Sequence, residues 1–268
     1  MLDPAVPLSS EVQPLLSYNY AVLLVHSGSR AHGQRVFSEH SDGHDPEGYM
    51  QQHEQLVAWA CRNRAEIARR FLMQFTGNRA IEDLSTSSEA SQAAGNRASA
   101  ANPDASPGLT SDSAEQAPQQ ELQPVIDTPH NWIERLPDGT FLHRKGAAPS
   151  YAGQLSLLPG SRATASYILA CNGSLERDLN SVAHGAGRRL SRADARRRGE
   201  GGKVLGDLTR GGTVVCESKD LLLEEAPHAY KDVEAVVACM VERGMCTVGA
   251  RMLPIATYKT RCGANSDH

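Results

Sequence analysis

One histidine in this sequence lies among residues suited to binding phosphate. His184 is followed by Gly185 and Gly187, and then by Arg188 and Arg189. Glycines let a backbone approach a ligand closely and expose its N–H groups, while paired guanidinium groups offer forked donors that match phosphate oxygens. A neutral imidazole beside such a phosphate can hydrogen-bond to it or attack it as a nucleophile. These residues alone are equally consistent with a nucleotide-phosphate site and with a polar turn, because short glycine-rich motifs recur by chance.

The segment that begins at His184 resembles a motif of the RtcB family of RNA ligases. That family carries H-G-A-G-R followed by S-R, which this chain matches at 184–188 and 191–192. Four further stretches match the family in the same order, namely His26-Ser27-Gly28-Ser29-Arg30, His130-Asn131, His143-Arg144-Lys145-Gly146-Ala147 with Pro159-Gly160-Ser161, and Glu224-Glu225-Ala226-Pro227 with Ala229-Tyr230-Lys231. Five ordered matches are far more specific than one. The segment Thr257-Tyr258-Lys259-Thr260 is most similar to a shorter bacterial branch, which is often linked with a release-factor-like protein.

The resemblance implies a ligase that depends on GTP and manganese (Mn2+). It would join RNA 3′-phosphate or 2′,3′-cyclic phosphate ends to 5′-hydroxyl ends, in RNA repair or tRNA splicing. In such a ligase His184 would become guanylylated by GTP and pass the guanylate to the RNA 3′-phosphate. His26 and His130 would bind manganese. The residues expected around the guanylate are His130, Asn131, Pro159, Gly160, Ser161, Arg162, Ser166, His184, Gly185, Ala186, Gly187 and Lys259.

The chain also departs from the family pattern. Arg162 and Ala163 follow Pro159-Gly160-Ser161, where the family commonly has methionine and then glycine. The N-terminal aspartate, the metal-bridging cysteine in a G-C-G context and the N-H-F segment of the family are absent from this sequence. The resemblance therefore indicates an N-terminally truncated ligase, whose remaining metal ligands a missing N-terminal region or a partner chain would supply. An inactive remnant that binds nucleotide or RNA stays open as the alternative, because a thiolate and a carboxylate do much to hold a divalent ion.

Hydrophobic patterns predict the elements that would position these residues. Residues 20–25 form a short apolar run typical of a buried strand, which would place His26 at a strand end. Residues 53–75 repeat apolar side chains at helical spacing, which predicts a core-supporting helix. Asn63 and Arg64 are long enough to reach a neighbouring site, but we expect them to be exposed to solvent. Further strands are expected at 155–158, 213–216 and 246–258, and an amphipathic helix is expected from Val233 to Val241, before Gly244.

These elements predict an α+β protein with mixed sheets and flanking helices, in the RtcB-like architecture. We expect residues 1–75 to form its N-terminal part and 125–262 its guanylate-binding part, followed by a short tail at 263–268. Residues 76–124 are rich in Ser, Ala, Gln and Pro and contain no aromatic residue. Such a composition buries too little apolar surface to offset the entropy of ordering, so a disordered insertion is predicted there.

Composition limits the cellular setting. The 268 residues carry a net charge of −4, so any contact with nucleic acid must come from a local patch. Six cysteines without a C-x-x-C pair indicate a reducing compartment. No stretch approaches ~18 consecutive apolar residues, so a cytoplasmic protein outside the membrane is expected. One local patch, which is either a solvated helix face or a phosphate-binding surface, consists of Arg188, Arg189, Arg192, Arg196, Arg197 and Arg198.

Overall fold

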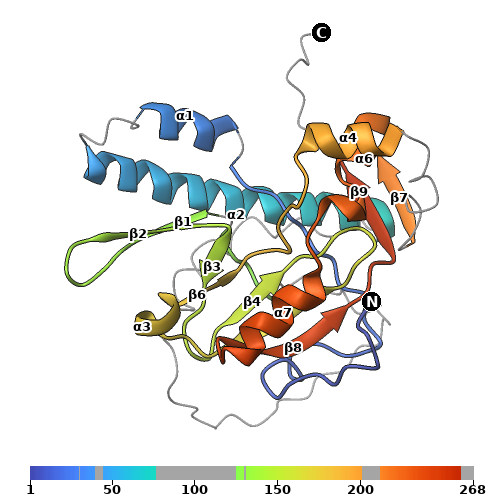
Figure 1. Ribbon diagram of the computed structural model, residues 1–268, viewed down its shortest axis with the longest axis horizontal. Coiled ribbons are helices and arrows are strands. Elements are labelled where there is room, and N and C mark those ends of the chain that lie inside the picture. The colour runs from blue at the N-terminus through green and yellow to red at the C-terminus, as the bar shows by residue number, and fades with distance from the viewer. Residues whose placement is uncertain (30, 40–44, 77–124, 130, 201–211, 261–268) are drawn as a thin grey trace, which may run out of the picture.

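The computed structural model describes residues 1–29, 31–39, 45–76, 125–129, 131–200 and 212–260, and within them it has the predicted α+β character (Figure 1). The helices are α1 (Ala31–Glu39), α2 (Pro46–Thr76), α3 (Leu175–Asp178), α4 (Arg192–Glu200), α6 (Lys219–Glu224) and α7 (Val233–Glu242), with a 3-10 turn η1 (Pro227–Ala229). The strands are β1 (Asn131–Arg135), β2 (Phe141–Lys145), β3 (Ala147–Pro149), β4 (Leu155–Leu158), β5 (Ser166–Cys171), β6 (Ser181–Ala183), β7 (Thr213–Cys216), β8 (Cys246–Met252) and β9 (Ala256–Lys259).

An antiparallel sheet in the order β4-β5-β8 organises the core. Every residue of β5 after Ser166 is buried, and a strand covered on both faces is expected to be apolar without alternation. The strand predicted at 155–158 is confirmed as β4. The remaining pairs are β1-β2 and β3-β6, which are antiparallel, and β7-β9, which is parallel.

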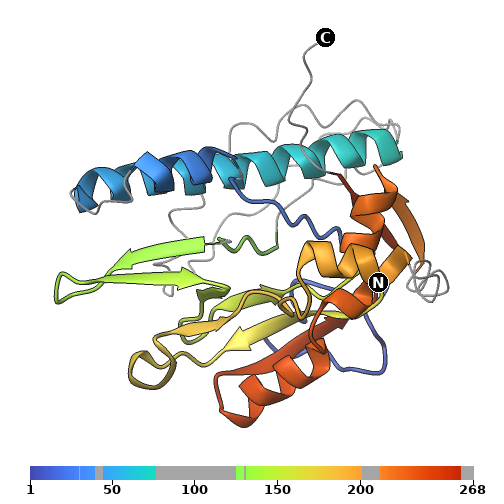
Figure 2. The same cartoon turned by 45° about the horizontal axis from the view of Figure 1, so that its top comes forward.

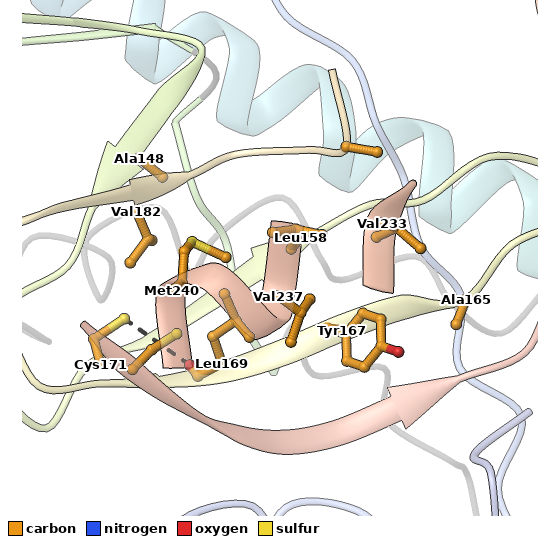
Figure 3. Packing of buried hydrophobic residues seen from close by; sticks show 12 residues of the cluster. Ala148, Leu158, Ala165, Tyr167, Leu169, Cys171, Val182, Val233, Val237 and Met240 are labelled. Carbon is orange, nitrogen blue, oxygen red and sulfur yellow. Dashed lines mark hydrogen bonds between the residues drawn. The ribbon is translucent and has the colours of Figure 1, made fainter. Parts of the chain in front are cut away.

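One face of this sheet packs against α7, β3 and β6 (Figure 3). Helix α7 begins after Asp232, whose side chain accepts a hydrogen bond from the N–H of Glu234. Just beyond its last residue, Gly244 has a φ of 64°, a conformation that favours glycine. The predicted amphipathic helix is thus confirmed. Its apolar stripe completes a cluster made of Ala148, Leu158, Ala165, Tyr167, Leu169, Cys171, Val182, Ala186, Val233, Val237, Met240 and Cys246.

The opposite face of the sheet is covered by the N-terminal residues, which form turns instead of a helix or strand. They follow the outer edge of β8: Asp3 N–H donates to Arg251 O at 2.8 Å, and Ser9 N–H donates to Gly249 O at 2.9 Å. The Arg251 guanidinium also donates to the Asp3 carboxylate. The apolar residues buried on this side are Leu2, Leu8, Val12, Leu16, Ile168, Ala250 and Met252.

The strand predicted at 20–25 is wrong. These residues belong to no helix or strand, and Tyr20 and Leu23 remain 57% and 39% exposed. A strand needs a ladder partner for its backbone groups, and residues 20–25 pair with no strand in the described part of the chain. Val22 still packs against the apolar residues that lie between the N-terminal residues and the sheet, so part of the run contributes to packing without forming a strand.

The helix predicted at 53–75 is confirmed as α2, although it begins earlier, at Pro46. Its role as core support is wrong, since only His53 and Ala60 are buried along it, and Phe71 and Phe75 are 45% and 78% exposed. Both views place α1 and α2 together on one side of the molecule, with α7 and β8 on the opposite side (Figure 1, Figure 2). Helix α2 therefore lies over the sheets from outside.

The strand predicted at 246–258 is divided into β8 and β9. Pro254 lies between them and has no N–H to continue a ladder. β9 then pairs with β7, which confirms the strand predicted at 213–216. The predicted insertion, apart from Thr76 at the end of α2, and the tail at 263–268 lie outside the described residues. No helix in the described ranges is long and apolar enough to cross a bilayer.

Candidate functional site

His184 follows the last residue of β6. β6 pairs with β3, and the N–H of His184 donates to the carbonyl of Gly146 at 3.4 Å. The chain then turns through Gly187, whose φ of 74° lies in the left-handed region that favours glycine. Sequence motifs that lie some 40 residues apart therefore meet at this turn. In the part of the chain that the structure describes, the N–H groups of Gly185 and Gly187 have no hydrogen-bond acceptor.

The loop after β4 packs directly against this turn. The carbonyl of Pro159 accepts a hydrogen bond from the N–H of Ala186 at 3.2 Å. Within the loop, Gly160 N–H donates to Ser166 Oγ at 3.0 Å, and Ser161 N–H donates to Thr164 Oγ1 at 2.7 Å. The structure thus brings four predicted contact residues, Pro159, Gly160, Ser161 and Ser166, beside the glycine turn.

Glycine at position 160 is required by close packing of the loop. A Cβ there would lie 2.0 Å from the carbonyl oxygen of Ala165 and 2.7 Å from Thr164 Oγ1. The first of these atoms belongs to the backbone and cannot rotate away. Gly160 therefore lets the two ends of the loop approach each other.

His26 lies opposite His184. The centroids of the two imidazole rings are 6.5 Å apart, and the ring planes make an angle of 75°. His26 is separated from His184 by most of the chain, so tertiary folding alone brings the two rings together. Two of the histidines predicted from the sequence therefore share one site.

Helix α2 holds the segment that carries His26. Arg64 Nη1 donates to Ser27 O at 3.0 Å, and Asn63 Nδ2 donates to Ser27 Oγ at 3.3 Å. The predicted solvent exposure of these two side chains is wrong, since that of Arg64 is only 11% exposed. One signal was available, because an Asn-Arg pair on a long helix can cap and clamp a neighbouring loop through several donors.

The same arginine also holds the segment that precedes His130. Arg64 Nε and Nη2 donate to the two carboxylate oxygens of Asp127 at 2.6 and 2.7 Å, a bidentate pair. Burial acts to raise the pKa of Asp127, but hydrogen bonds from Arg64 and Cys61 outweigh it and hold that pKa below its usual value. Burial and the neighbouring Asp127 raise the pKa of Cys61 to about 11. His130 itself lies outside the described residues.

A second cluster of charges adjoins the glycine turn, and Glu225 is its centre. Its carboxylate accepts hydrogen bonds from Arg188 Nη1 at 3.2 Å and from the hydroxyl of Tyr230, and Lys259 Nζ lies 3.7 Å away. Arg188 Nη2 also donates to Glu224 O at 2.6 Å. Burial, followed by the hydrogen bond to Glu225, raises the pKa of Tyr230. The motif match contained Glu225 and Tyr230, yet sequence reasoning assigned them no role.

The arginine patch contains some residues that contact a buried carboxylate and others that remain at the surface. The buried Glu224 carboxylate accepts a hydrogen bond from Arg196 Nη1 at 2.8 Å and lies 3.9 Å from Arg192 Nε. Arg197, in contrast, is exposed and pairs within α4 with Asp194. Part of the patch thus anchors α4 to α6, so it is neither a simple solvated face nor a free set of phosphate donors.

Two arginines from the predicted phosphate elements make internal contacts. Arg162 is 3% exposed and donates to Leu222 O at 2.7 Å. Arg144, also 3% exposed, donates to Glu134 at 2.7 Å and to Ser181 Oγ at 2.9 Å. Both guanidinium groups brace the framework around β6 and the loop after β4.

The remaining predicted residues take different positions. Asn131 is exposed at the start of β1, where it pairs with Lys145. Lys231 was part of the motif match but was assigned no role from the sequence. Its N–H donates to Gly187 O at 3.0 Å, and its side chain passes within 4.0 Å of a Cβ built on Gly187. Its ammonium group thus adds a cation to the glycine turn.

Among the described residues, no group of three His, Cys, Asp or Glu side chains is close enough to hold a metal ion. Of the two predicted manganese ligands, the structure describes His26 alone. One imidazole provides too few ligands for a metal site, so the described residues alone do not complete one.

Comparisons with known proteins point to one family. The family model described as "tRNA-splicing ligase RtcB" matches residues 14–260. The chain is 33% identical over 264 residues to "RNA-splicing ligase RtcB2" of Escherichia coli, covering 92% of this chain and 58% of that relative. It is 38% identical over 160 residues to "tRNA-splicing ligase RtcB" of Pyrococcus furiosus, covering 52% of this chain and 16% of that relative. It is 37% identical over 165 residues to the protein of the same name from Thermococcus kodakarensis, and the match covers 53% of this chain and 34% of that relative.

Proposed function

This chain belongs to the RtcB family, as its ordered motifs predicted, and from that membership we propose that it is an RNA ligase. It spans 58% of the length of the Escherichia coli relative, so the activity of a whole ligase is part of the proposal. One observation carries the assignment to a site: His184 stands at a glycine turn packed against the loop after β4, with His26 opposite.

We propose that His184 is the nucleophile toward GTP. An imidazole nitrogen would attack the α-phosphorus, a P–N bond would form, and the bond to the β-phosphate oxygen would break to release pyrophosphate. The guanylate would then move to an oxygen of an RNA 3′-phosphate. Attack by an RNA 5′-hydroxyl on that activated phosphorus would join the strands and release GMP.

The glycine turn would stabilise the charge that develops on the phosphate. The N–H groups of Gly185 and Gly187 are available to phosphate oxygens in the described part of the chain. Lys231 adds a cation beside Gly187, and Lys259 lies at the neighbouring Glu225. Pro159, Gly160, Ser161 and Ser166, gathered against the turn, would line the guanylate. Asn131 and Arg162 belong to the proposed contact set from sequence alone.

Manganese remains part of the proposal, with His26 and His130 as ligands. Bound there, it would act as a Lewis acid toward phosphate oxygens. The described residues alone do not complete a metal site, so the further ligands that the proposal needs would lie outside them, in the rest of this chain or in a partner chain.

The test is covalent labelling with GTP that carries its label on the α-phosphate, in the presence of manganese. The labelled adduct should be acid-labile and base-stable, as a phosphoramidate is. His184→Ala and His184→Asn should both abolish it, and the asparagine variant separates nucleophilic attack from loss of polar volume. Lys259→Ala should weaken the label without moving it, because a cation assists but forms no bond.

We expect weak labelling of this chain alone. Labelling should be stronger when the part of the Escherichia coli relative that this chain does not span is supplied as a second polypeptide. Label that persists in His184→Ala would refute the nucleophile. Absence of label even with the second polypeptide would favour the alternative function, a protein that binds nucleotide or RNA without catalysis.

A further inference from the structure

A groove of about 240 Å³ lies between α1 and α2, outside the site described above. α1 contributes His32 and Arg35, and α2 contributes Gln52, Gln55 and Trp59. Figure 1 shows α1 lying along the first half of α2. Helix α1, which forms one side of the groove, follows directly in sequence after the segment that carries His26.

Trp59 is the main apolar surface of this groove. It is 40% exposed, and its ring centroid lies 5.0 Å from that of His32 at an interplanar angle of 57°. Val36 and Leu56 line the groove beside it, and Val36 is buried. An indole left open above an apolar floor offers a surface on which a flat ring can stack.

The polar groups around Trp59 suit an unpaired nucleotide. The amides of Gln52 and Gln55 each carry a donor and an acceptor, as the edge of a nucleobase does. Arg35 is 72% exposed and pairs with Glu39 only at 3.7 Å, so its guanidinium can turn toward a phosphate. Proteins recognise single-stranded RNA by this combination of stacking, amide contacts and a nearby cation.

The position of the groove connects it to the proposed reaction. Trp59 precedes Asn63 by four residues, so the two share a face of α2 and lie about 6 Å apart along its axis. Asn63 holds Ser27, the residue next to His26. A strand whose end lies between His26 and His184 would thus meet the groove within a short run of nucleotides.

We propose that this groove binds one unpaired base of the RNA substrate, stacked on Trp59, near the end to be joined. The proposal rests on the RNA ligase function and names part of its substrate: a single-stranded segment beside the reacting end. A base-paired end has its bases stacked on each other, so it would not fill the groove. The enzyme would then prefer frayed or looped ends.

Tryptophan fluorescence gives a direct test, since the chain has two tryptophans, Trp59 and Trp132. In a Trp132→Phe variant, Trp59 becomes the only indole. Titration with a short single-stranded RNA ending in a 3′-hydroxyl, which cannot be ligated, should quench its emission. The same RNA annealed to its complement should quench it much less, and an abasic strand of the same length should not quench it.

Affinity measurements on matched variants complete the test. Trp59→Leu should weaken binding of the single strand by between about 5-fold and about 150-fold, the usual range for one stacked base. Trp59→Phe should retain most of the affinity, because it keeps an aromatic face. Phe75→Leu is the control, since Phe75 is 78% exposed on the same helix outside the groove.

Unquenched emission on binding, or equal affinities for Trp59→Leu and Phe75→Leu, would overturn the stacking proposal and leave the ligase proposal intact. Failure of the unaltered chain to bind RNA would also overturn it. The labelling of His184 by GTP needs no RNA, so that assay judges the proposed function separately.

Discussion

Replacing Arg64 with leucine should loosen both segments that lead to the predicted metal histidines. Arg64 donates three hydrogen bonds, two to the carboxylate of Asp127 and one to the carbonyl of Ser27. Its side chain is 11% exposed and that of Asp127 is 31% exposed, so water replaces these contacts only in part. Leucine would fill much of the space but would leave the carboxylate without its cation.

The expected loss in the free energy of unfolding follows from the type of hydrogen bond that the substitution removes. Hydrogen bonds to charged groups contribute about 1.5–3 kcal/mol, and the partial exposure of Asp127 favours the lower half of that range for the pair. We therefore expect Arg64→Leu to lower the free energy of unfolding by about 2 kcal/mol. In a double-mutant cycle with Asp127→Asn, measured by chemical denaturation at neutral pH, the coupling should be about 1.5 kcal/mol.

The loss should also depend on pH in a defined direction. The folded-state pKa of Asp127 is held below its ordinary value of 3.8, so the pair stabilises the fold above that value. This contribution disappears as the pH falls through the lower folded-state pKa. The stability difference between the unaltered chain and Arg64→Leu should thus be constant near neutrality and shrink below pH 3.8. A coupling below about 0.5 kcal/mol, or a difference that is as large in acid as at neutral pH, would refute the clamp.

Three further changes test other parts of the structure. Asp127→Asn should lower the pKa of the Cys61 thiol from about 11 toward its ordinary 9.0, and an unchanged pH profile of alkylation would argue against the contact. Gly160→Ala places a Cβ 2.0 Å from a backbone oxygen, so it should reduce GTP labelling at least about tenfold by shifting the loop. Leu169→Ala, at a fully buried position, should cost about 2–5 kcal/mol in thermal unfolding, and a cost below 1 kcal/mol would mean that the core cluster is poorly packed there.

Local patterns in the sequence predicted much of this fold. The short strands β4 and β7 and the helix α7 stand out because their apolar residues are bounded by turn residues. The motif order also led to the family, which the family model confirms over residues 14–260. In each case the deciding information lies within a few neighbouring residues.

Other features depend on partners that are distant in sequence. Residues 20–25 have the composition of a strand, but a strand also needs a partner strand, and none in the described part of the chain pairs with them. Arg64 looked like one more surface charge, because its partner Asp127 lies 63 positions away. Such contacts follow from the assembled fold, and no local spacing indicates them.

The N-terminal cover of the sheet has a consequence for how the chain folds. Asp3 and Arg251 are joined although 248 positions separate them, so the edge of β8 that they share is translated long after Asp3. Until β8 emerges from the ribosome, the apolar residues of the first segment have no sheet to cover. Contacts of such long sequence separation form slowly, because a large loop must close before they contribute. A chaperone that shields residues 2–16 during synthesis should therefore raise the yield of folded protein, more than one that acts after release.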